Sequence, residues 1–251
     1  MSAPEAILIV TALPEELEAV LDRAKPLRRI AAGSRPIWEG MLGGHPVVLA
    51  RTGVGERNAR EGMTELTTRL APARWIGAGL AGALSPEPEP GELVIASTVA
   101  DGAGYVMPPP DSGWAERALA CAPAARSARF FSTTRIAGKA AEKAALRALH
   151  GGGAVAAVDM ESAAWARAAA AAGSSAPYLL VRVISDAASE ELPEIVASAV
   201  AADGGIDRGR VVRRALLRPG AVGKLLALRR RAQLSARRLA EFLERCAAAG
   251  F

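Results

Sequence analysis

The sequence contains very few of the side chains on which many catalytic sites depend. Only two histidines, His45 and His150, and two cysteines, Cys121 and Cys246, occur among its 251 residues. A serine- or cysteine-hydrolase triad needs a positioned histidine base, and a catalytic zinc needs more nitrogen or sulfur ligands than these residues supply. The cysteine spacing fits neither a disulfide framework nor a metal site. We therefore expect a cytoplasmic protein with no metal, no cofactor and no histidine-dependent hydrolase site.

Aromatic residues and long apolar runs are also scarce. Aromatic side chains make up 4% of the chain, which favours helices packed closely on a sheet over a β-sandwich. No apolar run is long enough to span a membrane, and the N-terminus lacks the pattern of a signal peptide. The pattern G-x-x-x-x-G-K-[ST] is absent, which excludes a P-loop nucleotide site. The apolar fraction of 51% is nevertheless ample for one large core.

The apolar residues form short runs that alternate with stretches of helical periodicity. The runs typical of buried strands are residues 6–10, 47–50, 75–78, 93–99, 154–158 and 178–184. A hairpin is predicted around Gly43 and Gly44. Apolar residues at helical spacing occur in four stretches, which come after the first predicted strand, after Arg57, after Lys139 and after Asp159. This pattern predicts one α/β domain with a mixed, mostly parallel sheet covered by helices on both faces.

A glycine-rich segment, Gly77 to Gly82, matches the spacing G-x-G-x-x-G of dinucleotide-binding domains. That motif works only where a helix begins at the glycines, because the helix N-terminus holds the pyrophosphate. Here three alternating prolines follow at residues 86–90 and leave no room for a helix before the next strand. We therefore predict that the segment is a loop after the third strand that serves another ligand.

Carboxylates follow several of the predicted strands, at the edge where open α/β sheets bind their ligands. Glu16 follows the first strand, Asp159 and Glu161 follow the fifth, and Asp186 follows the sixth. Carboxylates around a cleft without histidine or metal suit cleavage of a glycosidic bond, since one acid protonates the leaving group and one carboxylate activates water. The alternative is structural: acids in first helical turns are ordinary caps, and Arg182 is a candidate partner for Asp186.

Five segments taken in order resemble the nucleoside phosphorylase/nucleosidase superfamily, especially the methylthioadenosine/S-adenosylhomocysteine nucleosidases. They are ILIVTALPEELEAV, VVLARTGVGERNAR, WIGAGLAGALSPEPEPGELVIAS, AVDMESAAWARAA and YLLVRVISDAASEELP. The resemblance runs from residue 6 to about residue 195 and implies a three-layer α/β/α sandwich that forms a homo-oligomer, with a dimer favoured.

The resemblance also implies roles for individual residues. Glu16 matches the carboxylate that holds or activates the attacking water, and Asp186 matches the acid that protonates or hydrogen-bonds N7 of the purine. Glu161 matches the carboxylate that grips the ribose hydroxyls, with Met160 beneath the sugar. The remaining residues expected to bind the substrate are Asp159, Gly79, Leu80, Ala81, Gly82 and Ser185.

Several departures from the family pattern bear on the reaction. The purine phosphorylases carry one arginine where this chain has Glu16 and a second where it has Gly77. Without these cations a phosphate dianion would face carboxylates, so we expect hydrolysis in preference to phosphorolysis. A loop serine of the family is Leu80 here, and no base-stacking aromatic segment is recognisable near Phe130 and Phe131.

The C-terminal part of the chain differs from the rest in charge. Between Arg208 and Arg245 there are 12 lysines and arginines against two acids. We therefore divide the chain into a nucleosidase-like domain, residues 1–200, and a basic helical extension, residues 201–251, packed on it. VDMES and this tail resemble the hopanoid-associated phosphorylase-like proteins, which implies adenosylhopane as substrate.

Apolar residues at helical spacing in this tail predict an amphipathic helical pair broken at Pro219-Gly220. The apolar residues are Leu216, Leu217, Leu225, Leu226, Leu228, Leu239, Phe242 and Leu243. Such a pair fits either peripheral contact with the inner face of an anionic membrane or packing on the body with a solvated arginine face.

We expect an N-glycosidase that releases adenine from a 5′-substituted adenosine, with adenosylhopane favoured. Methylthioadenosine/S-adenosylhomocysteine nucleosidase and phosphate-dependent phosphorylase are the alternatives within the enzymes. A catalytically inactive nucleoside-binding or membrane-associated protein is the alternative outside them. A nucleic-acid partner is not expected, because stacking aromatics are scarce in the basic tail.

Overall fold

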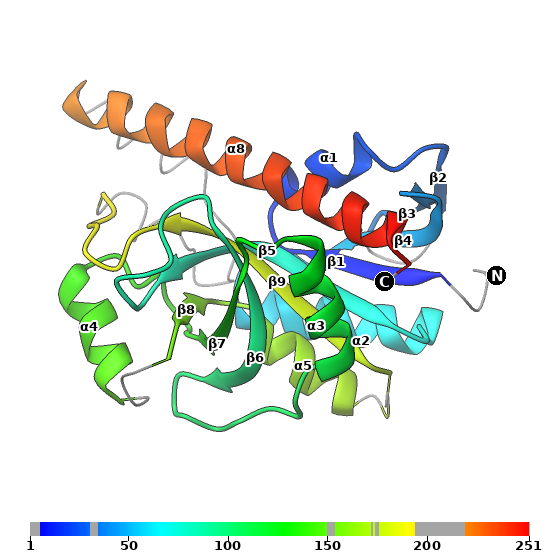
Figure 1. The fold of residues 1–251 in the computed structure, drawn as a ribbon, viewed down its shortest axis with the longest axis horizontal. Helices are drawn as coiled ribbons and strands as arrows, with labels where there is room; N and C mark the ends of the chain where they lie inside the picture. The colour runs from blue at the N-terminus through cyan, green and yellow to red at the C-terminus, as the bar shows by residue number, and fades with distance from the viewer. Residues whose placement is uncertain are drawn as a thin grey trace.

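The computed structural model describes residues 6–30, 35–149, 154–171, 173, 176–193 and 219–250. Its centre is a nine-stranded mixed sheet in the order β2-β3-β4-β1-β5-β8-β7-β6-β9, in which β5 also pairs with β9 (Figure 1). The strands are β1 (Ile7–Thr11), β2 (Leu27–Ile30), β3 (Ile37–Leu42), β4 (His45–Arg51), β5 (Trp75–Ala83), β6 (Leu93–Asp101), β7 (Arg126–Ser132), β8 (Ala156–Asp159) and β9 (Tyr178–Asp186).

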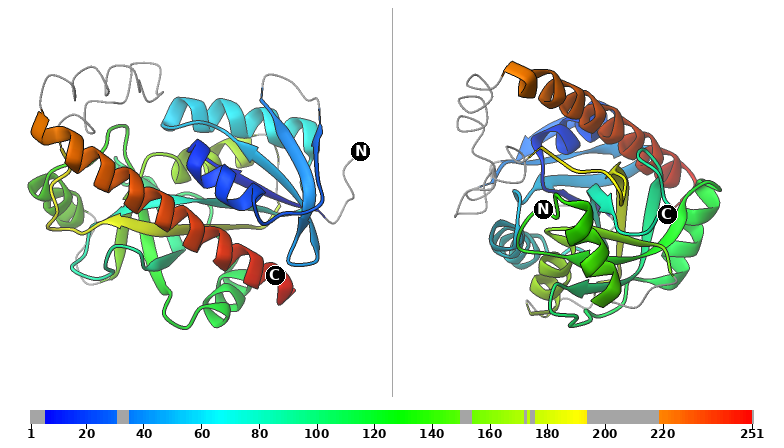
Figure 2. Two further views of the ribbon diagram at one scale, coloured as in Figure 1. Left: turned by 90° about the horizontal axis from the view of Figure 1, so that it is seen from above. Right: turned by 90° about the vertical axis from the view of Figure 1, so that its left-hand side faces the viewer.

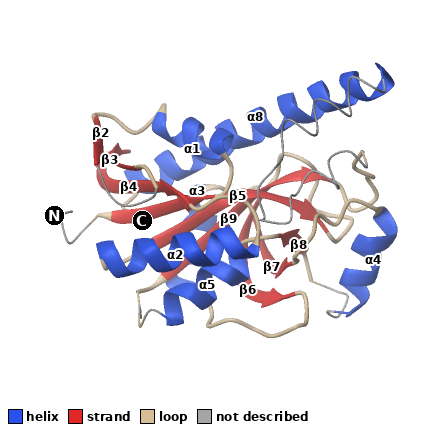
Figure 3. Cartoon of the chain, turned by 180° about the vertical axis from the view of Figure 1, so that it is seen from behind, coloured by secondary structure: helices blue, strands red, loops and turns tan. Residues whose placement is uncertain are grey.

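Helices cover both faces of this sheet. They are α1 (Pro14–Leu21), α2 (Glu56–Leu70), α3 (Ser112–Cys121), α4 (Ala140–Leu149), α5 (Ser162–Ala171) and α8 (Pro219–Ala248). Helices α2 and α5 lie together on one face (Figure 3), and α8 contacts α1, α3, β5 and β9 on the other. The prediction of an α/β fold with a mixed sheet between two helical layers is confirmed.

Alternation along the central strands gives the protein two hydrophobic cores. Leu8 and Val10 of β1 belong to the core beneath α2 and α5, whereas Ile7 and Ile9 belong to the core beneath α1, α3 and α8. Successive side chains of a strand point to opposite faces, so a strand covered on both faces is apolar on both, as Ile7 to Val10 are. All five of its residues are buried.

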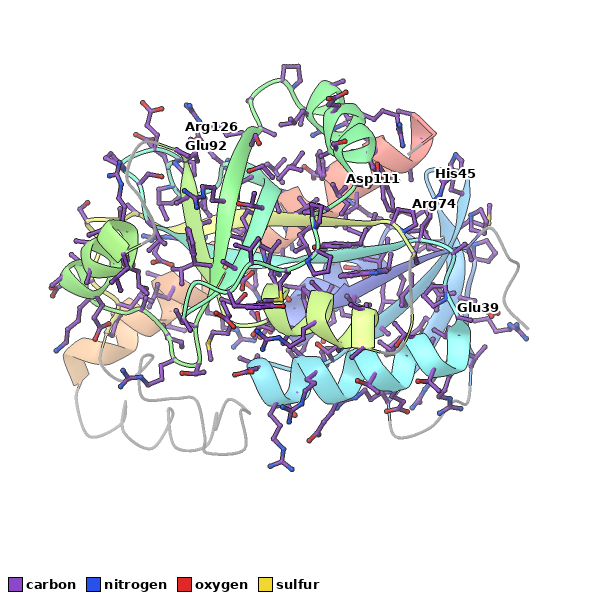
Figure 4. All side chains as sticks on the ribbon, turned by 90° about the horizontal axis from the view of Figure 1, so that it is seen from below. Glu39, His45, Arg74, Glu92, Asp111 and Arg126 are labelled. Carbon is purple, nitrogen blue, oxygen red and sulfur yellow. The ribbon has the colours of Figure 1, made fainter. Side chains whose placement is uncertain are left out.

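The sheet is parallel where β1, β4, β5 and β9 meet and antiparallel at the β3–β4 hairpin. Its second half closes on itself, because β9 pairs with β6 on one side and with β5 on the other. Because β1, β5 and β9 run parallel to one another, their carboxyl ends point to the same side of the molecule. His45 begins β4, at the opposite end of the sheet (Figure 4). His150 lies outside the described residues.

The glycine-rich segment differs from its prediction. No helix follows the glycines, as expected, but Gly77 to Gly82 lie within β5 and not in a loop after it. The strand is longer than predicted because it pairs with β1 in its first half, with β8 in its second half and with β9 along most of its length. Strands β2 and β7 and helix α3 were also missed by the sequence patterns.

The C-terminal helix α8 crosses the sheet diagonally (Figure 2). Its buried residues recur at helical spacing: Ala236, Leu239, Ala240, Phe242, Leu243, Cys246 and Ala247. The helix begins at Pro219, where a break was predicted. Leu216, Leu217 and the predicted domain boundary at residue 200 lie outside the described residues. Among the described helices, none combines the length and hydrophobicity that a membrane span requires.

Candidate active site

A cavity of about 260 Å³ lies at the carboxyl ends of β1, β5, β8 and β9, and the first half of α8 borders it. Nine of the ten residues predicted to form the site line this cavity: Glu16, Leu80, Ala81, Gly82, Asp159, Met160, Glu161, Ser185 and Asp186. The tenth, Gly79, lies beside Glu16 and Arg182. Residues far apart in the sequence meet here because parallel strands end at one edge of the sheet.

Glu16 is held by backbone donors at the start of α1. Its Oε2 accepts hydrogen bonds from the N–H groups of Ala12 at 3.0 Å and Leu13 at 2.8 Å, and its Oε1 accepts from Leu80 N–H at 3.0 Å. Burial raises the pKa of Glu16, while these donors and the charge of Arg182 oppose the shift. A raised carboxyl pKa suits a group that takes a proton from water near neutral pH.

Glu161 lies between β8 and α5 and faces the same cavity. Its Oε1 accepts a hydrogen bond from Gly55 N–H at 2.8 Å. Burial raises the pKa of Glu161 to about 7, with a further rise from the charge of Asp159, whereas Arg182 acts in the opposite direction. Its other oxygen has no hydrogen bond among the described residues, so Glu161 retains acceptor capacity toward a ligand.

Asp159 and Arg182 form a fully buried ion pair. Nε and Nη2 of Arg182 lie 2.9 Å and 2.8 Å from Oδ2 of Asp159. Asp159 also accepts hydrogen bonds from the hydroxyls of Ser132 and Ser162. The prediction that Arg182 pairs with Asp186 is therefore wrong, because the arginine side chain lies across the sheet toward the end of β8.

One nitrogen of Arg182 remains without a protein partner. Nη1 is buried and has no hydrogen bond among the described residues, and it lies against Gly79 in β5. A Cβ atom at position 79 would overlap Nη1 and would lie 3.0 Å from Oε1 of Glu16. Gly79 thus provides the space in which the guanidinium and the Glu16 carboxylate approach each other.

Asp186 ends β9 and has a partner that sequence analysis did not identify. Its Oδ2 lies 2.5 Å from Nζ of Lys143, and both side chains are buried. Its Oδ1 accepts a hydrogen bond from the hydroxyl of Ser185, whose oxygen also lies 3.1 Å from the carbonyl oxygen of Ala81, so the single proton is shared between the two acceptors. Lys143 lies in the helical stretch AAEKAALRAL, whose alanines and charges are typical of a solvent-exposed helix, so no sequence signal marks it.

A larger cavity of about 780 Å³ adjoins the first between α4 and α5. The two share the residues Thr133, Arg135, Ile136, Ala137, Met160 and Leu192. Apolar side chains from α4 and α5, including Leu146 and Ala163, line the larger one. Charged side chains, among them Asp101, Glu142 and Arg167, line the larger cavity as well, so it is mixed in character.

Three carboxylates, those of Glu16, Glu161 and Asp186, therefore face one cavity. Among the described residues, no cluster of histidine, cysteine and acidic side chains is arranged to hold a metal ion. Beside the cavity lie the buried cations Lys143 and Arg182, each paired with an aspartate.

Curated relatives match a limited part of the chain. The 5′-methylthioadenosine/S-adenosylhomocysteine nucleosidase of Desulfotalea psychrophila is 34% identical over 91 residues, which are 36% of this chain and 39% of that protein. The protein of the same name from Tolumonas auensis is 31% identical over 91 residues, 36% of this chain and 40% of that protein. These matches span about two fifths of the relatives' length.

Solved structures and a family profile match nearly the whole chain. A Neisseria meningitidis nucleosidase of the same name, in complex with methylthio-immucillin-A, superposes with a TM-score of 0.75 at 20% identity over 98% of this chain and 99% of that one. The futalosine hydrolase of Helicobacter pylori gives a TM-score of 0.74 at 17% identity, covering 97% of each chain. The profile described as the phosphorylase superfamily matches residues 6–216. The chain therefore belongs to the phosphorylase superfamily.

Proposed function

We propose that this protein is a nucleosidase that hydrolyses the N-glycosidic bond of a 5′-substituted adenosine and releases adenine. The observation that carries the proposal is the convergence of Glu16, Glu161 and Asp186 on one cavity, each held at the end of a different strand. Paired carboxylates on opposite sides of a glycosidic bond are the usual machinery for its hydrolysis.

The contacts of each carboxylate assign it a role. Glu16, with a raised pKa and Nη1 of Arg182 nearby, takes the proton of a water that attacks C1′ of the ribose. Glu161 accepts hydrogen bonds from the ribose hydroxyls through its unoccupied oxygen. Asp186 delivers a proton to N7 of the purine as the bond to N9 breaks. An oxocarbenium-like transition state gains from the negative charge around it.

The charges of the cavity favour water over phosphate as the nucleophile. Arg182 is neutralised by Asp159, and Lys143 by Asp186. Arg231, which lines the cavity, forms an ion pair with Glu190 at 2.6 Å. Among the described residues, a phosphate dianion beside Glu16 would thus meet a carboxylate and, apart from the exposed Arg135, only the Nη1 edge of Arg182, an arrangement that costs desolvation without an equal electrostatic gain.

The 5′ substituent that we favour is the hopane of adenosylhopane. Two features support a large substituent: the cavity of about 780 Å³ that adjoins the nucleoside site, with Leu146 and Leu149 among its lining residues, and the basic first part of α8. Residues 219–240 include no acid, and Leu226 and Leu234 are 60% and 52% exposed. Exposed leucines among arginines suit peripheral contact with an anionic membrane that holds a lipid substrate.

Methylthioadenosine is the second candidate, because the relatives at 34% and 31% identity are named for its cleavage. The distinguishing experiment measures adenine release from adenosylhopane and from methylthioadenosine, each with and without phosphate. We expect phosphate-independent release from adenosylhopane. Better turnover of methylthioadenosine would remove the lipid assignment, and strict phosphate dependence would contradict hydrolysis.

The role of Asp186 is tested in the same assay with Asp186→Asn. We expect release to fall by about 10²- to 10⁴-fold, the usual contribution of a positioned acid. Asp111→Asn is the matched control, because Asp111 caps α3 through Trp114 N–H away from the cavity (Figure 4) and asparagine caps helices equally well. Absence of release by the wild type from either substrate would instead favour a binding protein.

A further inference from the structure

Lys143 is a fully buried lysine beside the proposed active site, and none of the steps above uses its charge. Its side chain is 0% exposed. Nζ lies 2.5 Å from Oδ2 of Asp186, 2.7 Å from the carbonyl oxygen of Ala187 and 3.0 Å from that of Glu190. Three acceptors at hydrogen-bond distance match the three N–H donors of an ammonium, whereas a neutral amine has only two.

Structural stability alone does not account for a charge at this position. Removing an ammonium from water costs several kcal/mol, and buried ion pairs can often be replaced by apolar residues without loss of stability. The rest of α4 is built mainly of alanine and leucine, which would fill the space without that cost. The ammonium of Lys143 instead contacts Asp186, the carboxylate that the proposed reaction places beside the departing purine.

We propose that Lys143 is a positioning residue for Asp186, and that it supplies through Asp186 the proton that the purine takes on leaving. The inference rests on the proposed nucleosidase function. With the ammonium at Oδ2 and the Ser185 hydroxyl at Oδ1, the carboxylate is fixed in orientation and lies within direct reach of a proton donor.

The proton balance of this step is complete. The C1′–N9 bond breaks and its electron pair goes to the purine, while Asp186 gives a proton to N7 and receives one from Lys143, which becomes a neutral amine. Water adds to C1′ and loses its proton to Glu16. After adenine has left, Glu16 returns a proton to solvent and Lys143 takes one back.

Two other charged groups near this pair, Glu190 and Glu142, are engaged elsewhere. Glu190 binds Arg231 of α8, and Glu142 of α4 accepts hydrogen bonds from the N–H groups of Gly138 and Lys139. Arg135 and Glu161 line the same cavity. Among the described residues, Asp186 is the only carboxylate that Nζ of Lys143 contacts.

The test compares Lys143→Met, Lys143→Arg and the control Arg147→Met, which removes the other basic residue of the same helix and lies outside the lining of both cavities. Adenine release is measured with whichever substrate the wild type cleaves, as kcat and KM across the pH range in which the enzyme is folded. We expect Lys143→Met to lower kcat by about 10²-fold, the scale of general-acid catalysis, with little change in KM. Lys143→Arg should restore part of the rate, and Arg147→Met should match the wild type.

The pH profile separates proton supply from support of the fold. In Lys143→Met no ammonium can supply the proton, so only enzyme molecules whose Asp186 is already protonated can react. The alkaline limb of the kcat–pH profile should therefore move to lower pH in this variant. An unchanged limb, with kcat and thermal stability reduced together, would show a merely structural role and overturn the inference. Lys143→Gln serves the same comparison if the methionine variant does not fold. A wild type that releases no adenine would overturn the proposed function and this inference with it.

Discussion

Three glycines of β5 set how closely functional side chains approach the backbone of the sheet. A Cβ at Gly82 would lie 2.9 Å from Oδ2 of Asp186, and one at Gly77 would lie 2.7 Å from the Trp165 ring. At Gly79 it would overlap Arg182. Real Cβ atoms do not come so close to their neighbours, so any side chain here would displace a group of the site or of the adjoining core.

We expect Gly79→Ala to impair the reaction more than the fold. The added methyl group must move Nη1 of Arg182, which is held by Asp159, or the Glu16 carboxylate. Overpacking of this kind costs about 1–3 kcal/mol, measurable by denaturant unfolding, while turnover should fall further because the base is displaced. Gly113→Ala is the control, since its Cβ would meet nothing closer than 3.6 Å. Wild-type turnover in Gly79→Ala would contradict this account of the site.

The pH dependence of activity should reflect Glu161. Burial raises its pKa to about 7, and only the ionised carboxylate is a full acceptor for two ribose hydroxyls. We expect kcat/KM to rise with pH through this region as Glu161 loses its proton. Glu161→Gln should lower kcat/KM and remove that rise, since the amide does not titrate. A rise that persists unchanged in the variant would assign it to another group.

At this scale the positions of Glu16, Glu161 and Asp186 were predictable because each directly follows an apolar strand. Their partners were not predictable. Arg182 lies in the same strand as Asp186, yet its side chain reaches Asp159, and Lys143 comes from a helix that looks solvent-exposed. Side-chain pairing across 43 residues of sequence depends on how strands and helices are stacked, which no local pattern encodes.

Helix α8 is the element that closes one side of the molecule. Its buried face packs on α1 and β9, and its last turn lies against Gly43, which has a φ of +54° in the β3–β4 turn. A Cβ at Gly43 would lie 2.7 Å from the backbone N of Ala248. The first half of α8 borders the cavity through Leu228, Arg231 and Ala232.

Truncation of the buried face of α8 should destabilise the whole protein. Phe242 is fully buried, and removal of a core phenylalanine ring typically costs about 3–5 kcal/mol. We expect Phe242→Ala to lower the free energy of unfolding by this amount in denaturant titrations. The exposed Gln233→Ala in the same helix should stay near the wild type. Equal, small effects of both would mean that α8 contributes little to the folded core.

The end of β5 shows where local pattern and tertiary structure disagree. Glycines lower strand propensity, so the sequence predicts a loop after residue 78. The strand nevertheless continues to Ala83 because β8 and β9 supply hydrogen-bonding partners. The same pairing explains the missed strand β7, whose polar residues Arg126, Ser127 and Arg129 obscure its alternation.

On the scale of the whole molecule, two buried glutamates make stability depend on pH. The pKa values of Glu16 and Glu161 are raised above the ordinary value of 4.5 by burial. The folded state therefore binds more protons than the unfolded state between pH 4.5 and the folded pKa, which for Glu161 is about 7. Their contribution to stability is fully present below pH 4.5 and is lost as pH rises through the folded values.

We expect the free energy of unfolding to decrease as pH rises through this window, measured by denaturant titration at a series of pH values. Glu161→Gln should flatten the decrease, because the amide removes the titrating group from both states. Glu61→Gln, at an exposed ion pair with Arg57, should leave the slope unchanged. A slope of opposite sign in the wild type would mean that these two carboxylates are not buried as described.

The sequence by itself determined the alternation of strands and helices, the mixed sheet covered on both faces, the absence of a dinucleotide fold and the carboxylates at the strand ends. These follow from the periodicity of apolar residues and from local breakers such as the prolines at 86–90. Tertiary structure alone decided the closure of the sheet through β9, the pairing of Lys143 with Asp186, and the placement of α8 beside the cavity. Those features depend on contacts between segments far apart in the chain, whose energies arise only when the whole core is assembled.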